Sequence, residues 1–92
     1  MRRAPTRPVC PMDQGVLVAI ARFPDRGHAI EELARRNEEF RSICADLADA
    51  EAAAVRWEQS GAREREVRSA EYRELARELA AELAATLDRH SQ

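Results

Sequence analysis

The stretch LARELAAELAATL at residues 75–87 is the part of this sequence that most directly predicts the fold. Its leucines recur at every fourth position, so we expect them to share one side of an α-helix. An earlier apolar series follows steps of three and four and consists of Ile30, Leu33, Asn37, Phe40, Cys44 and Leu47. Both series therefore predict amphipathic helices, each with one apolar face that must be covered.

Ser60 and Gly61 separate the two apolar series. If the chain reverses there, the series match in antiparallel register, and glycine suits the left-handed position that ends many helices. We expect an all-α fold, an antiparallel and coiled-coil-like hairpin with a helix at 25–59, a turn at 60–61 and a helix at 62–89. Because a glycine inside a helix costs only about 1 kcal/mol relative to alanine, one long helix in a coiled-coil dimer is the alternative.

The chain is short for a self-contained core. Its 92 residues make one small domain, and contents of 45% hydrophobic and 35% charged residues are typical of a soluble helical protein. Two helices cannot enclose a core, so each would leave part of its apolar stripe in contact with water. We therefore expect the hairpin to form a homo-oligomer or to bind a partner protein helix, and so to complete a helical bundle.

The segment before Pro24 differs in composition from the rest of the chain. It holds three prolines, a residue type that sustains neither a helix nor a full strand ladder: Pro5, Pro8 and Pro11. We expect residues 1–22 to form a flexible arm and residues 23–92 to form the hairpin domain. Within the arm, the apolar run at 16–21 favours either a helical turn or a segment packed loosely on the hairpin, because a lone strand would have nothing to pair with. Pro24 with Asp25 predicts the start of the first long helix.

The net charge of −2 is unevenly distributed. Residues 1–22 carry four arginines and one acid, whereas the remaining chain carries eleven arginines and sixteen acids. An acidic hairpin lacks the positive surface that a phosphate backbone requires, so we do not expect the helices to bind nucleic acid. The arginines of the arm leave one alternative function open, a nucleic-acid or ribosome-associated accessory protein.

No constellation of residues predicts chemistry. The candidate zinc ligands are not at a chelating spacing from one another: Cys10, Cys44, His28 and His90. There is no glycine-rich phosphate loop and no nucleophile elbow, so we expect no catalytic residue, no cofactor, no metal and no enzyme activity. The longest apolar run, at 16–21, is far shorter than the ~20 residues of a membrane span, which makes the cytoplasm the expected location.

Two polar or aromatic positions each allow two interpretations. Asn37 occupies a core-type position of the first series, where a buried amide commonly fixes register or oligomeric state; the alternative is a half-exposed residue at the wide end of the hairpin. Trp57 lies near the predicted turn. It is expected to clamp the two helices, since a tryptophan can cover a thin hairpin tip; the alternative is an exposed patch shared with Val67.

Residues 23–89 resemble the YdcH-like family of small bacterial helical proteins. The resemblance rests on Phe23, Pro24, Ile30, Leu33, Asn37, Phe40, Leu47, Glu51 and Glu58 before the turn, and on Glu71, Leu75, Glu78, Leu79 and Leu83 after it. The chain departs from the family pattern because it has no lysine in the second helix, more alanine and an extension of 22 residues. The resemblance implies an antiparallel helical hairpin of uncharacterised function and supplies no catalytic residues.

The apolar series and the aromatic residues near the turn define the expected interaction face. It consists of Ile30, Leu33, Asn37, Phe40, Ile43, Cys44, Leu47, Trp57, Tyr72, Leu75, Leu79, Leu83 and Leu87. The leading hypothesis is a non-enzymatic interaction protein that uses this face to self-associate or to dock a partner helix.

Overall fold

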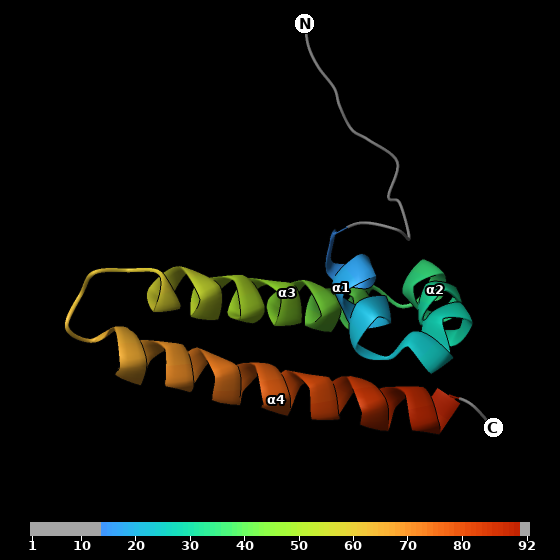
Figure 1. Cartoon of the computed structure of the whole chain (residues 1–92). Coiled ribbons are helices and arrows are strands. Elements are labelled where there is room, and N and C mark those ends of the chain that lie inside the picture. Colours follow the sequence, from blue (N-terminus) through green and yellow to red (C-terminus); the bar gives the residue numbers. More distant parts are fainter. Residues whose placement is uncertain (1–13, 91–92) are drawn as a thin grey trace, which may run out of the picture.

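The computed structural model describes residues 14–90, and all regular structure in that range is helical (Figure 1). The elements are α1 (Gln14–Arg22), the 3-10 turn η1 (Pro24–Arg26), α2 (Gly27–Arg36), α3 (Glu38–Glu58) and α4 (Arg65–His90). The all-α prediction is confirmed for these residues. The simple two-helix hairpin is not, because four α-helices build the fold.

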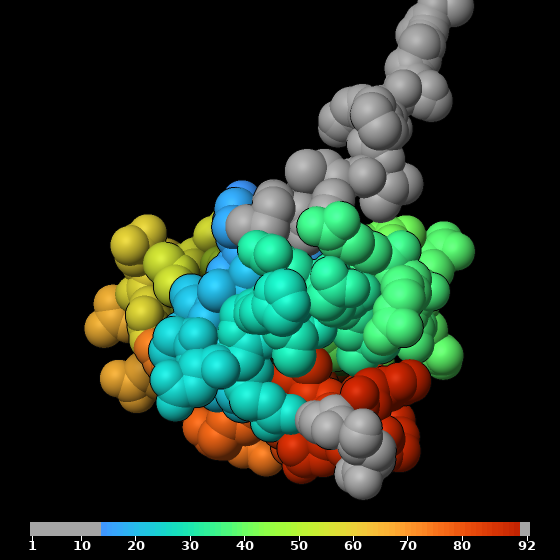
Figure 2. Space-filling model, turned by 90° about the vertical axis from the view of Figure 1, so that its right-hand side faces the viewer, coloured from blue at the N-terminus to red at the C-terminus, as the bar shows by residue number. Residues whose placement is uncertain are grey.

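The long helices α3 and α4 run antiparallel and side by side (Figure 1). α1 packs on α3, while α2 packs on α1 and also meets α3 and α4. Both short helices lie at the end of the pair that holds the C-terminus, and the opposite end projects beyond them (Figure 1). Seen from the end of the pair where the two short helices lie, α1, α2, the start of α3 and the end of α4 form one packed surface (Figure 2).

This arrangement divides the α3–α4 pair into two parts with different surroundings. We call residues 14–51 and 76–90 the covered half, and residues 52–75 the tip half. The main core cluster lies entirely in the covered half and draws its largest fully buried side chains from all four helices: Val16, Ile30, Phe40, Cys44, Leu47 and Leu83. The chain therefore encloses a core of its own, which the two-helix prediction did not allow.

Asn37 ends one helix and begins the next, so the helix predicted over 25–59 is interrupted. Its backbone is extended, at φ −131° and ψ 104°. Its side-chain Oδ1 accepts a hydrogen bond from the Phe40 N–H at 3.0 Å, which is the bond that a helix N-cap makes. Arg41 donates to the Ala34 carbonyl at 2.7 Å and so satisfies an acceptor at the end of α2. Asn37 is thus an N-cap, which neither sequence-based interpretation included, and its intermediate burial agrees with the half-exposed interpretation.

The start of the first long helix also differs from the prediction. Pro24 opens η1 and the α-helix proper begins at Gly27, not at residue 25. The Phe23 N–H still donates to the Ala19 carbonyl at 2.9 Å, but Pro24 has no N–H with which to continue α1. The proline therefore marks the end of a preceding helix as well as a new start.

Part of the predicted flexible arm is a packed helix. Val16 and Ala19 on α1 are fully buried, and α1 lies very close to α3 at Gly15. A Cβ atom added to Gly15 would fall 2.8 Å from the Ala45 nitrogen and 2.9 Å from its Cα. Only glycine allows the two backbones to approach this closely. The helical interpretation of residues 16–21 agrees with this, while residues 1–13 lie outside the part of the chain that the structure describes.

The connection between α3 and α4 spans residues 59–64, which is longer than the predicted turn at 60–61. The Ser60 N–H donates to the Trp57 carbonyl at 3.1 Å, and Ser60 Oγ accepts from the Ala62 N–H at 2.9 Å. Gly61 does not have a positive φ, so the reversal does not depend on a left-handed glycine. The chain does reverse here, and the alternative of one continuous long helix is wrong.

Candidate interaction surface

The leucine series of α4 passes from the core to the surface. An α-helix turns through about 100° per residue, so a repeat of four residues advances by about 40° at each step. Leu83 is fully buried and Leu87 nearly so, Leu79 is partly buried, and Leu75 is 42% exposed. The repeat that predicts one continuous face instead spirals out of the core toward the tip.

Most residues of the predicted interaction face are buried in the core and cannot contact a partner protein. Its members buried inside the chain are Ile30, Leu33, Phe40, Cys44, Leu47, Leu83 and Leu87. Ile43 and Leu79 are partly buried against the same core, and Asn37 serves as the cap described above. The predicted residues that belong to the tip half are Trp57, Tyr72 and Leu75.

Small side chains fill the space between α3 and α4 in the tip half. The buried residues there are Ala53, Ala54 and Ser69, and Ser69 Oγ donates to the Glu66 carbonyl at 3.3 Å. Helices packed through such small residues lie close together. A leucine or an aromatic ring does not fit between them and lies along the edge of the pair.

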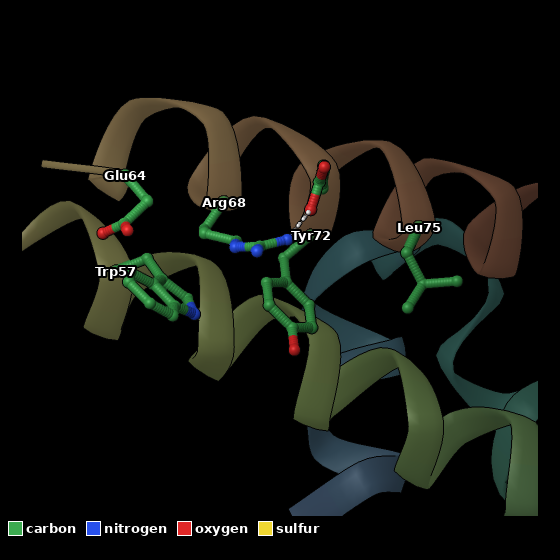
Figure 3. Close-up of a pocket in the computed structure, with 6 residues that line it drawn as sticks. Trp57, Glu64, Arg68, Tyr72 and Leu75 are labelled. Atoms are coloured by element: carbon green, nitrogen blue, oxygen red, sulfur yellow. Dashed lines mark hydrogen bonds and ion pairs between the residues drawn. The ribbon is translucent and has the colours of Figure 1, made fainter.

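Two adjoining grooves follow that edge. One of about 520 Å³ is lined by Trp57, Glu64, Arg68, Glu71, Tyr72 and Leu75 (Figure 3). The other, of about 480 Å³, is lined by Asp46, Asp49, Ala50, Ala53, Arg56, Tyr72, Leu75 and Leu79. Tyr72 and Leu75 belong to both, so the grooves form one continuous surface along α3 and α4. We call it the groove face and define it by Trp57, Tyr72, Leu75 and Leu79.

Trp57 from α3 and Tyr72 from α4 project into the same groove, with Arg68 extending above them (Figure 3). Arg68 donates to Glu71 Oε1 at 3.0 Å. Val67 is 60% exposed and does not line this groove. Trp57 thus shares a groove with Arg68, Glu71 and Tyr72 of α4 and not with Val67, so the alternative patch with Val67 does not form in this groove.

The other side of the α3–α4 pair has a different character. Its groove of about 300 Å³ is lined by Arg22, Glu51, Ala54, Val55, Arg73, Ala76 and Arg77. Arg22 of α1 pairs with Glu51 of α3 at 2.8 Å, and Arg73 of α4 pairs with Glu58 of α3. Charged side chains thus bridge this side, whereas large apolar side chains gather on the groove face.

Residues 14–90 contain neither a metal-ligand cluster nor a helix suited to span a membrane. No three histidine, cysteine, aspartate or glutamate side chains converge there as a possible metal-ligand cluster. None of the helices in this range is both long enough and apolar enough to cross a bilayer. Cys44 is buried in the core as a free thiol, and Cys10 lies outside the described range.

Comparison with known proteins found no family model, no curated protein and no solved structure that matches this chain. The resemblance of residues 23–89 to the YdcH-like family therefore stays a prediction. Over residues 14–90 the structure defines a small all-α protein with a closed core at one end and an apolar groove face toward the other.

Proposed function

We propose that this protein is a non-enzymatic interaction module that associates with another helical protein surface, its own or a partner's, through the groove face. The observation that carries this proposal is the position of Leu75. It is 42% exposed, yet it lies between half-buried Tyr72 and Leu79 on a surface shared by two grooves. A partner that covers these side chains would remove a continuous apolar strip from water.

The composition of the groove face resembles that of protein interfaces in general. Tryptophan and tyrosine are over-represented among the residues that contribute most to binding, and polar rims commonly surround an apolar centre. Here Trp57, Tyr72 and Leu75 form the centre, and Asp49 and Arg56 lie along one margin. Tyr72, Leu75 and Leu79 also have the three- and four-residue spacing with which one helix docks on another.

Two substitutions on α4 test this proposal. Leu75→Glu places a charge at the centre of the groove face, and Val67→Glu places the same charge on α4 outside it. Both positions are exposed, so the two variants should have closely similar helix content and melting temperature. Light scattering of the purified chain, together with quantitative affinity capture from a cell lysate, measures association.

We expect Leu75→Glu to weaken whichever association the wild type shows by about tenfold or more, since it buries a charge in place of an apolar side chain. Val67→Glu should leave it unchanged. Equal behaviour of the two variants in both measurements would contradict the proposal.

The alternative of a nucleic-acid-binding accessory protein receives no support from the described residues. Of the four arginines in residues 1–22, Arg22 lies in the described range, where it pairs with Glu51. Arg2, Arg3 and Arg7 lie outside that range. This alternative stays a prediction from the sequence.

A further inference from the structure

We propose that the partner on the groove face is a second copy of this chain, packed with its α3 antiparallel to the first α3. This inference rests on the proposed function, because it names the occupant of the same surface.

Three charged residues border the groove along α3: Asp46, Asp49 and Arg56. The two acids lie on one side of Ala53 and the arginine on the other. No ion pair within residues 14–90 engages any of the three. The margin of the groove is therefore negative toward the covered half and positive toward the tip, and both charges are free to meet a partner.

A two-fold axis across α3 near Ala53 makes this margin complementary to itself. Asp49 and Arg56 lie three or four residues on either side of the axis, so Asp49 of each copy faces Arg56 of the other. The arrangement is isologous and gives the same ion pair twice.

The other two-fold arrangement places the two tips together and α3 of one copy over α4 of the other. Arg56 of one copy would then lie over the part of α4 where Glu64, Arg68 and Glu71 line the groove, and Arg68 already pairs there with Glu71. This arrangement contains no Asp49–Arg56 pair. Of the two arrangements, the antiparallel one places the unpaired charges of the α3 margin opposite each other.

The area that the two copies bury determines the affinity expected for the dimer. α3 ends at Glu58, five residues beyond Ala53, so the two copies overlap over about 12 residues, or roughly 18 Å, and two helices packed side by side are about 20 Å wide. A contact of these dimensions buries on the order of 700 Å² in total, which is typical of weak and transient association. We expect a weak dimer with a Kd in the micromolar range.

Reversal of the two charges, separately and together, tests the arrangement. Asp49→Arg alone brings two arginines together twice in the dimer, and Arg56→Asp alone brings two aspartates together twice. Each variant alone should dimerise about tenfold more weakly than the wild type, or less well still, in sedimentation velocity. An equimolar mixture of the two variants should recover dimerisation, because each copy then offers the charge that the other lacks. The double variant should recover it as well.

The mixing experiment excludes effects within one chain, since nothing inside either variant changes on mixing. Glu32→Arg on α2 is the control: it alters net charge as Asp49→Arg does, at an exposed position remote from the groove face, and should dimerise like the wild type.

A mixture no more associated than its components would overturn the antiparallel arrangement. A wild type that stays monomeric at about a hundred times the expected Kd would overturn the second copy as partner. If capture from lysate still depended on Leu75 in that case, the proposed function would stand and only this inference would fail.

Discussion

The covered half and the tip half of the molecule share two helices but pack in different ways. In the covered half, α1 and α2 lie over the α3–α4 pair, and residues as large as Phe40, Ile30 and Leu83 are fully buried. In the tip half, the α3–α4 pair projects beyond α1 and α2 (Figure 1), and the buried residues there, within the part of the chain that the structure describes, are Ala53, Ala54 and Ser69. Enclosure by additional helices is what allows a large side chain to leave water. The same pair of helices thus supplies stability at one end and an accessible apolar surface toward the other.

The largest expected difference between the two halves is the loss of stability when a leucine of the same series is truncated in each. Leu83→Ala removes a fully buried side chain and leaves a cavity, so it should lower the free energy of unfolding by about 2–5 kcal/mol. Leu75→Ala removes a side chain that is 42% exposed, and should cost less than about 1 kcal/mol. Urea denaturation followed by circular dichroism measures both. Similar losses for the two variants would show that the halves do not differ as described.

The two glycines Gly15 and Gly61 give a second, smaller contrast. Gly15→Ala should lower the free energy of unfolding by about 1–3 kcal/mol, because its Cβ would meet the backbone of Ala45 and force α1 away from α3. This loss is expected despite the gain in helix propensity, which is at most about 1 kcal/mol.

Gly61→Ala is the matched control. No atom lies within 4 Å of the added Cβ, and the backbone is not left-handed. It should be neutral or stabilising by up to about 1 kcal/mol. Thermal melts of both variants test the pair, and a neutral Gly15→Ala would mean that α1 is not held against α3 in this way.

The smallest expected effect concerns the break that orients α2 over the covered half. Asn37→Ala removes the acceptor for the Phe40 N–H and should cost about 1 kcal/mol. Asn37→Asp keeps an acceptor and should remain within a few tenths of a kcal/mol of the wild type. Loss of stability in both variants, measured by urea denaturation, would assign Asn37 a role other than capping.

Much of the helical content could be predicted from the sequence, since α4 follows the leucine series closely. The break at Asn37 could not be predicted from the apolar series, because Leu33 and Phe40 continue the pattern on either side of it. The local signal was present: an asparagine followed by Glu38 and Glu39 is typical of a helix N-terminus. The prediction followed the apolar spacing and so continued the helix through Asn37. In the structure, Asn37 caps α3 and the helix is interrupted there.

The packed helix α1 depends on tertiary structure that no local pattern contains. Its apolar run at 16–21 is short, and its close approach to α3 requires Gly15 to meet Ala45, a residue 30 positions away. All four residues that define the groove face belonged to the expected face: Trp57, Tyr72, Leu75 and Leu79. That face was drawn too wide because a four-residue repeat was treated as one stripe, although the geometry of the helix makes it spiral.

The order of the helices along the chain has a consequence for how the protein folds. In the tip half, the end of α3 meets the start of α4, and the connection between them spans only residues 59–64. The covered half is closed by residues near opposite ends of the described chain, such as Arg26 and Asp88, which pair at 3.2 Å. Closing a longer loop costs more chain entropy and is generally slower. We therefore expect the weakly packed tip to form early and the well-packed half to be completed last, so that the folding route begins where the molecule is least stable.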